Sequence, residues 1–435
     1  NFLLADYSQI ETPMAMDILN HILISTPASP LRKALIDSGL GEDLAGVGLE
    51  PNLAQQFFST GLKGIKVEDA GKVEALVLET LQKLAQNGID PETGAASLNS
   101  VEFALRERNT GRFPRGLAVM LGALTTWLHG ADPCATLAFE APLQVIKDAV
   151  GRGERYFEQL LQQYFVDNTH RVTVFLKPEP GYQQKQDEAE RQRLEQVRSK
   201  MDRFALEEVI QSTAALKKAQ EAVDTPEALA TIPALALKDL AKENEHIPQE
   251  MLDSAGHKIL YHDLFTNGIA YFDLGFDLHA LPQTLLPFVP LFGRALLEMG
   301  TEKEDFVRLS QRIGRTTGGI VPSALTATIS GSECSTTWLV LRGKATLDHT
   351  QDLVQILQDV MLTTQFDNPE RFRQILLEDK ANMEAMLVPA GHFVVNRRLS
   401  AQFTESAWVN EQISGLDYLF FLRKLMDRVE FQYYQ

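Results

Sequence analysis

Nine histidines are the side chains of this sequence best suited to bind a catalytic metal, and their spacing argues against a shared site. No two of them lie three or four residues apart, so no helix can present two imidazoles on one face. The nearest pair, His257 and His262, flanks a predicted strand, where residues five apart point to opposite faces. The sequence therefore predicts no metal-binding and no catalytic residue on the basis of its histidines.

Other catalytic patterns are also missing from the sequence. It contains no Walker loop, no G-x-S-x-G motif and no C-x-x-C pair. Cys134 and Cys334 lie far apart, and we expect both to be reduced and mostly buried. Neither a disulfide nor a zinc ribbon is indicated.

Two basic, glycine-containing stretches are candidates for anion binding. "FALRERNTGRFPRG" gathers Arg106, Arg108, Arg112 and Arg115 after a predicted helix, and "RIGRTTGGI" covers residues 312–320. Cations are also favoured at the end of a helix by its dipole, and a glycine-rich segment commonly forms a turn. We favour these structural explanations for both stretches.

Composition excludes some classes of function and fits others. The 435 residues carry 41 Lys plus Arg and 58 Asp plus Glu, a net charge of -17, which argues against nucleic acid as a partner. This charge suits a cationic ligand such as a basic peptide, although solubility alone would also explain it. No apolar run approaches the ~20 residues that cross a membrane, so no membrane association is expected. Because the chain opens on "NFLLADYS" without an initiator Met, we expect a fragment of a longer protein.

Strand and helix patterns divide the chain into three parts. Residues 1–180 alternate between the two, with strands at "NFLLADY" and "QQFFSTGLKGI" and a closing strand at "HRVTVFLKP". Between them, a predicted helix that ends at Gly88 carries an apolar stripe of Val73, Leu76, Val77, Leu81 and Leu84. Residues 181–250 are charged and helical, with a turn near Met201 and then a proline-containing connector. Residues 254–435 return to the first pattern, and Asn267-Gly268 predicts a hairpin.

The first and third parts resemble each other. "STGLKGIKVEDAGKVEALVLETLQKLAQNGIDPE" aligns with "TWLVLRGKATLDHTQDLVQILQDVMLTTQFDNPE" almost without gaps, at an offset of roughly 280 residues. We therefore predict a duplicated α+β domain on either side of a helical strut. Taken on its residues alone, such a chain would be a scaffold or a binding module.

Several stretches together resemble the presequence-protease branch of the pitrilysin/insulinase zinc metallopeptidases. They follow one another along the chain: "TPASPLRKALIDSGLG", "FSTGLKGI", "SVEFALRERNTGRFPRGL", "HDLFTNGIAYFDLGFDL", "LLPFVPLFGRALLEMGT" and "RIGRTTGGI". The resemblance implies two homologous metallopeptidase-like α/β sandwich domains joined by a helical hairpin. By this resemblance, residues 1–180 are most of the second of four domains, residues 181–250 the hairpin and residues 254–435 the third domain.

The resemblance also implies which parts of the enzyme lie elsewhere. The first domain, with the inverted zinc motif H-x-x-E-H, and the fourth domain, which supplies transition-state residues, would flank this chain. The two zinc-ligand positions fall at Leu291 and Ala295 and the general-base position at Arg294. None of these side chains can ligate zinc or activate a water. The chain is therefore expected to bind no zinc and to be inactive alone.

As part of the intact protein, these residues are expected to wall a closed chamber that degrades unstructured, possibly basic, peptides. Candidate chamber-lining residues are Arg315, Thr317, Gly318 and Gly319, although we favour a structural turn for this segment. The resemblance places the protein in solution, in a bacterial cytoplasm or an organelle matrix.

Two other hypotheses compete with this one. The first is a non-catalytic structural or assembly subunit of the same fold, and the second is a peptide-binding adaptor. A zinc motif in the upstream reading frame would distinguish the enzyme from the first of them.

Overall fold

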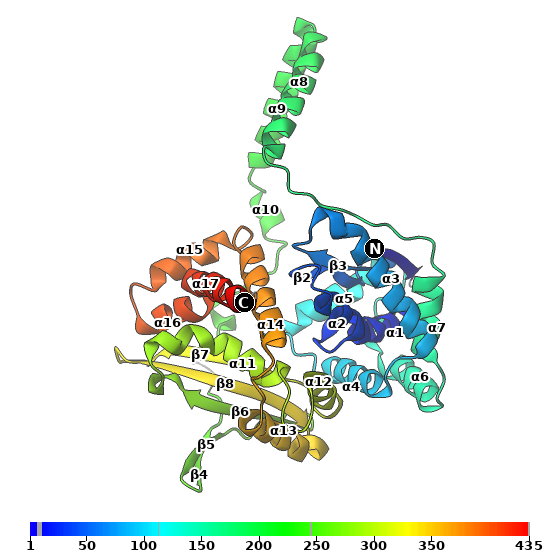
Figure 1. The fold of residues 1–435 in the computed structure, drawn as a ribbon. Coiled ribbons are helices and arrows are strands. Elements are labelled where there is room, and N and C mark those ends of the chain that lie inside the picture. Colours follow the sequence, from blue (N-terminus) through cyan, green and yellow to red (C-terminus); the bar gives the residue numbers. More distant parts are fainter. Residues whose placement is uncertain (7–10, 112, 244–245, 434–435) are drawn as a thin grey trace. The chain divides into compact units, whose positions relative to one another are not determined.

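A computed structural model describes residues 1–6, 11–111, 113–243 and 246–433 of the chain. It divides into two compact units: Asn1–Val174 together with Thr266–Gln435, and Phe175–Phe265. We call residues 1–174 the first lobe and residues 266–435 the second lobe of the larger unit. Each lobe combines one antiparallel sheet with helices, which confirms the predicted α+β class (Figure 1). No helix among the described residues is long and apolar enough to cross a membrane.

The first lobe is built around an antiparallel sheet with the strand order β1-β3-β2. Its strands are β1 (Phe2–Asp6), β2 (Asp43–Glu50) and β3 (Gln55–Lys63). Its helices are α1 (Glu11–Asn20), the π-helical η1 (His21–Ser25), α2 (Pro30–Asp37), η2 (Val67–Asp69), α3 (Ala70–Asn87), α4 (Pro91–Glu107), α5 (Arg115–Trp127), η3 (Ala135–Leu137), α6 (Glu140–Gly151), α7 (Tyr156–Leu161) and the π-helical η4 (Gln162–Val166).

The apolar stripe predicted for α3 forms part of the core of this lobe. Val73, Val77 and Leu81 are buried at intervals of four residues, which places them on one face of the helix. The helix ends before Gly88, whose φ of 96° lies in the left-handed region that favours glycine. The pattern of the sequence thus predicted both the buried face and the end of this helix.

The second lobe repeats this topology, with the strand order β6-β8-β7. Its strands are β6 (Ile269–Asp277), β7 (Ile320–Thr328) and β8 (Ser335–Thr346). Its helices are η6 (Leu278–Ala280), η7 (Gln283–Phe288), α11 (Val289–Glu298), α12 (Phe306–Thr316), η8 (Leu347–His349), α13 (Thr350–Leu362), α14 (Pro369–Met386), α15 (Gly391–Ser400), α16 (Glu405–Ser414) and α17 (Leu416–Tyr433). In each lobe the third strand is central, and two long helices follow it. This correspondence agrees with the duplication seen in the sequence.

The smaller unit contains the predicted helical pair. Its helices are α8 (Tyr182–Ser199), α9 (Arg203–Glu221), α10 (Pro226–Leu229) and η5 (Leu237–Asp239), and its strands are β4 (Glu250–Ser254) and β5 (His257–Tyr261). Asp202 begins α9 by accepting a hydrogen bond from the backbone N–H of Ala205, at 2.7 Å. Neither α8 nor α9 has a buried residue, as their high charge predicts.

One predicted strand does not form, and one strand of the structure was not predicted. The segment "HRVTVFLKP" forms no strand: Arg171 makes an isolated bridge with Phe2, and only its immediate neighbours bond to the edge of β1. β1 has five residues and an interrupted register, so it offers few positions for pairing. β2 was missed because Gly46 and Gly48, with φ of 96° and 70°, introduce an irregular register and weaken the strand pattern.

The two strands on either side of the predicted Asn-Gly turn do not pair with each other. Asn267 and Gly268 do form a turn, with φ of 52° and 78°. However, β5 pairs with β4 through Ala255 and Gly256, whose φ values are also positive, while β6 pairs with β8. The Asn-Gly pair predicts the local turn, but the partner of each strand depends on contacts with more distant segments.

Both cysteines differ from the expected burial. Cys134 and Cys334 are free, and both are exposed. Cys334 lies in the turn between β7 and β8, and Cys134 precedes η3. Turns and loops run over the protein surface, so the usual burial of cysteine does not apply at these positions.

The two lobes contact each other through α12 and α4. The side-chain amide of Asn99 donates to the carbonyl oxygens of Gly314 and Thr317, at 2.7 and 3.1 Å. These carbonyls lie at the end of α12, where a helix leaves its acceptors without partners of its own. Gly318 packs directly on Phe103 of α4, and a Cβ at this glycine would overlap the aromatic ring.

Gly318→Ala is therefore expected to lower the free energy of unfolding by about 1–3 kcal/mol, because the methyl group must displace Phe103. Gly71→Ala is the matched control: it lies in α3 with open space at its Cβ, so it should stabilise the chain by about 0.5–1 kcal/mol. Urea unfolding followed by circular dichroism measures both. Equal effects of the two variants would contradict the packing described.

Candidate functional site

A cavity of about 1050 Å³ lies in the larger unit, with residues of both lobes in its wall. Its volume is at the upper end of the range usual for ligand sites. The wall is predominantly apolar, with side chains that include Met14, Leu49, Phe103, Val119, Leu297 and Ile320. Such a wall suits the side chains of a peptide or another partly apolar ligand.

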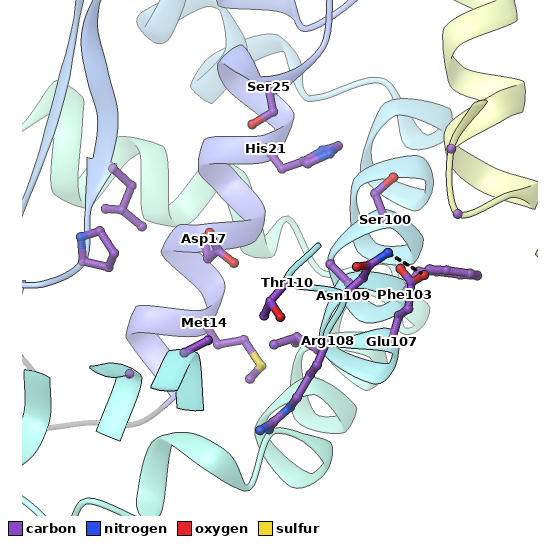
Figure 2. A pocket seen from close by; sticks show the side chains of 18 of the residues that line it. Met14, Asp17, His21, Ser25, Ser100, Phe103, Glu107, Arg108, Asn109 and Thr110 are labelled. Atoms are coloured by element: carbon purple, nitrogen blue, oxygen red, sulfur yellow. Dashed lines mark hydrogen bonds between the residues drawn. The ribbon is translucent and has the colours of Figure 1, made fainter. Parts of the chain in front are cut away.

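One side of the cavity is formed by α1 and its π-helical continuation η1. Asp17 and His21 are four residues apart, so they lie on one face of this helix and both line the cavity (Figure 2). The side chain of Asp17 is accessible from the cavity but surrounded by protein, and this loss of hydration raises the pKa of its carboxyl. Burial lowers the pKa of the His21 imidazole, whose Nδ1 lies 3.0 Å from the Ser97 hydroxyl.

The opposite side is formed by the end of α4 and by the sheet of the second lobe. Glu107 accepts a hydrogen bond from the Tyr271 hydroxyl at 2.8 Å and forms an ion pair with Lys344. Burial alone would raise the pKa of Glu107, but the hydrogen bonds from Lys344 and Tyr271 outweigh it and bring that pKa below its ordinary value. Burial and the Glu107 carboxylate raise the pKa of Tyr271 to about 12. This pair of contacts joins the lobes at the cavity wall.

Arg108 ends α4 in a backbone conformation that is unusual for arginine. Its φ of 46° lies in the left-handed region, and its guanidinium donates to the carbonyl oxygen of Leu137 at 3.0 Å and lies over the ring of Phe139. Residues held in such conformations cluster at functional sites, as do π-helical segments. Both features occur in the wall of the same cavity.

The predicted anion site is not assembled as one cluster. Arg106 pairs with Glu102, whereas Arg108 and Arg115 donate to backbone carbonyls and line the cavity. Arg112 lies outside the described residues.

The predicted chamber-lining residues fall into two groups. Gly318 and Gly319 lie in the cavity wall. Arg315 instead pairs with Glu92 of α4, and Thr317 is buried at the contact between α12 and α4. Whether any of them faces a peptide chamber stays a prediction.

Sequence reasoning missed Asp17 and His21. The spacing between histidines does not reveal a carboxylate and an imidazole that lie four residues apart. The available signal was the four-residue spacing of Asp17 and His21, which with Asn20 are the polar residues in the otherwise apolar run "MAMDILNHIL".

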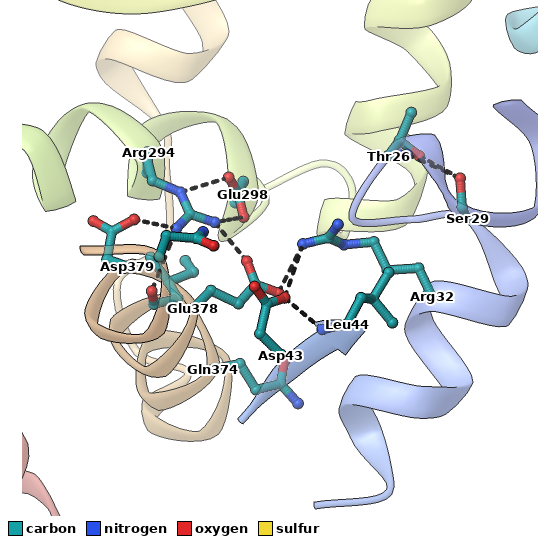
Figure 3. Close-up of polar contacts among 12 residues, drawn as sticks. Thr26, Ser29, Arg32, Asp43, Leu44, Arg294, Glu298, Gln374, Glu378 and Asp379 are labelled. Carbon is teal, nitrogen blue, oxygen red and sulfur yellow. Dashed lines mark hydrogen bonds and ion pairs between the residues drawn. The ribbon is translucent and has the colours of Figure 1, made fainter. Parts of the chain in front are cut away.

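A buried ion cluster occupies the helix at which the resemblance places a zinc motif. Leu291 and Ala295 of α11 are 1% and 3% exposed and pack in the core of the second lobe. Arg294, between them, binds three carboxylates: Glu298 at 3.0 Å, Glu378 at 2.8 Å and Asp379 at 2.6 Å (Figure 3). Apolar packing and a paired guanidinium therefore fill the three positions at which that motif requires ligands and a base.

The ion cluster extends into the first lobe. Arg32 of α2 lies 3.1 Å from Oε1 of Glu378, as an ion pair that leaves this oxygen without a directed hydrogen bond. Arg371, 4% exposed, pairs with Glu298 at 2.7 Å. Burial alone would raise the pKa of Glu378, but Arg32 and Arg294 outweigh burial and lower it. The paired carboxylate thus links α11 and α14 of one lobe to α2 of the other.

No group of three or more His, Cys, Asp or Glu side chains is placed to hold a metal ion within the described part of the chain. His262 instead contacts the carbonyl oxygen of Pro248, at 2.8 Å, and both His257 and His262 are exposed.

Comparison with known families matches most of the chain. Residues 1–97 match the family described as "Peptidase M16 inactive domain", and residues 176–425 match "Peptidase M16C associated".

Individual relatives match over nearly the whole chain. Presequence protease 1, chloroplastic/mitochondrial, of Arabidopsis thaliana is 40% identical over 99% of this chain and 40% of its own length. Protein HypA of Clostridium perfringens is 34% identical over 97% of this chain and 43% of its own. The solved structure of pitrilysin aligns with 97% of this chain and 42% of its own, with 14% identity and a TM-score of 0.39. The chain thus spans about two fifths of the length of these relatives.

Removing one charge from the ion cluster is expected to destabilise the larger unit. Glu378→Gln should lower the free energy of unfolding by about 3 kcal/mol, because the half-buried Arg32 and Arg294 lose the buried anion that they share. The lowered pKa means that the wild type loses this contribution as pH falls through the folded pKa of Glu378, so the difference should shrink in acid. Urea unfolding from neutral to acidic pH measures this difference. Glu188→Gln, which removes an exposed partner of Arg191, is the control and should change stability by less than about 0.5 kcal/mol.

Asp17→Asn is expected to have the opposite effect and to stabilise the chain at neutral pH. The ionised carboxyl loses hydration in the cavity, so its removal should raise the free energy of unfolding by about 0.5 kcal/mol, a small value because the side chain still contacts cavity solvent. Since the folded pKa is raised, the penalty is absent below the ordinary carboxyl pKa, develops as pH rises from that value to the folded pKa, and is constant above it. Thermal unfolding at several pH values checks this. A stabilisation that does not vary with pH would contradict it.

Proposed function

Because this chain belongs to the presequence-protease branch of the M16 peptidases, we propose that it is a non-catalytic part of a zinc metalloendopeptidase that degrades unstructured peptides. In this proposal the zinc and its ligands belong to a domain outside these residues. Residues 1–180 and 254–435 are the second and third peptidase-like domains, and residues 181–250 connect them.

The observation that carries this proposal is the filling of the metal-site positions in α11. A zinc site of this class needs two imidazoles and a carboxylate around an open coordination position. Here Leu291 and Ala295 are packed in the core, and Arg294 is held by three carboxylates. Exchanging these side chains for ligands would leave buried acidic groups without their cation, so the helix is built for packing rather than for metal binding.

The cavity supports the second part of the proposal, a role in holding peptide. It has apolar walls, a few polar groups and contributions from both lobes. In a closed chamber, such a surface would hold unstructured segments and exclude folded proteins by size. The missing first domain would add the catalytic zinc, and the fourth would add groups that stabilise the transition state.

The location of the protein is also a proposal. The relatives from Arabidopsis thaliana and Danio rerio are named chloroplastic/mitochondrial and mitochondrial, respectively. We place this protein in solution in a comparable organelle matrix or in a bacterial cytoplasm.

The coding sequence on both sides of this chain provides the first test. We expect it to encode H-x-x-E-H upstream, and the longer polypeptide to cleave an unfolded peptide in a zinc-dependent way. The 435-residue chain alone should retain far less than one zinc per molecule and cleave nothing. Metal analysis after gel filtration and a quenched-fluorescence peptide assay measure these outcomes.

The control replaces the glutamate of the upstream motif by glutamine, which should abolish cleavage and leave the fold intact. A longer reading frame without the motif would contradict the enzymatic proposal and favour a structural or assembly subunit. Stoichiometric zinc on the 435-residue chain would contradict the proposal as well.

A further inference from the structure

Asp17 differs from every other charged side chain in the described wall of the cavity. Lys344 pairs with Glu107, and Glu298 binds Arg294 and Arg371. The remaining charged wall residues bond to the backbone: Arg108 to Leu137, Arg115 to Glu107 and Asp132 to Cys134. Asp17 alone has neither an ion pair nor a hydrogen bond within the described part of the chain.

An unpaired carboxylate in such a place is unfavourable for the folded chain. Surrounding protein takes away part of its hydration, and no described cation compensates for the loss. Asp17 lies in α1 between the buried Met16 and Ile18, so its direction into the cavity is fixed by the packing of its neighbours. The rest of the protein therefore holds a negative charge toward the cavity space.

A bound cationic ligand would relieve this penalty, and the residues around Asp17 indicate which class of cation fits. A divalent metal ion needs several carboxylate or imidazole ligands, and the described residues offer no such group. An organic cation needs one carboxylate and an apolar surface for its carbon chain. Met14, one turn before Asp17, and Leu49 provide such a surface in the wall.

We propose that Asp17 receives the guanidinium or ammonium group of a basic side chain in a peptide that occupies the cavity. The inference rests on the proposed peptide-holding function and adds the residue that selects among peptides. The apolar wall takes the methylene groups of the basic residue and its apolar neighbours in the peptide. The net charge of -17 favours the approach of such a peptide.

A peptide pair that differs in one charge tests this inference on the 435-residue chain. One labelled, unstructured peptide carries a single arginine, and its partner carries neutral, nearly isosteric citrulline at the same position. Fluorescence anisotropy gives both affinities. We expect the arginine peptide to bind roughly tenfold more tightly, as for a charge-assisted hydrogen bond in a partly desolvated site.

The variants of Asp17 separate its charge from its shape. Asp17→Asn should abolish the difference between the peptides and leave the affinity for the citrulline peptide unchanged, whereas Asp17→Glu should retain part of the preference. Asp263→Asn is the matched control, because it removes an equal charge from an exposed position in the smaller unit. This control should preserve the difference.

Three results would overturn the inference: equal affinities of the wild type for the two peptides, a preference that survives Asp17→Asn, or no binding of either peptide up to about 1 mM. The proposed function is judged separately, by zinc-dependent cleavage in the longer polypeptide. Cleavage without arginine selection by Asp17 would reject only the present inference. An absence of cleavage together with a preference of Asp17 for the arginine peptide would reject only the proposal that the longer protein is an enzyme.

Discussion

The larger unit depends on the pairing of buried charge around Arg294. A guanidinium removed from water is tolerated only where carboxylates surround it, and Glu298, Glu378 and Asp379 meet this requirement. Glu378 also faces Arg32 of the first lobe. The requirement for neutralisation therefore constrains α11, α14 and α2 together, across a sequence separation of more than 300 residues. Removal of any one partner leaves the others buried and incompletely neutralised.

In the cavity, by contrast, one charged side chain has no partner among the described residues. The other charged groups of the described wall each have an ion pair or a hydrogen bond to the backbone, but Asp17 has neither and faces the cavity. Proteins commonly give up some stability at functional sites. The π-helical η1 and the left-handed Arg108 occur in the same wall. Three unusual features therefore occur in the wall of one cavity, and together they indicate a functional site more strongly than any one of them does.

The two lobes share a topology, although the side chains at corresponding positions differ in their chemistry. Both lobes have an antiparallel sheet in which the third strand is central, followed by two long helices. In the second lobe, the helix that resembles a zinc helix carries leucine, arginine and alanine in place of ligands. In this lobe, the framework holds an ion cluster at the three positions where the resemblance places the zinc motif.

By itself, the sequence determined the local structure and the similarity of the two lobes. The apolar spacing in α3, the turn at Asn267-Gly268 and the absence of zinc ligands at Leu291 and Ala295 could all be read from neighbouring residues. Tertiary structure alone decided that β5 pairs with β4, that residues 170–178 form no strand, and that Asp17 shares a cavity with Glu107. Periodicity and turn chemistry act over a few residues, whereas strand partners and cavity walls arise from contacts between distant segments whose free energies no local pattern records.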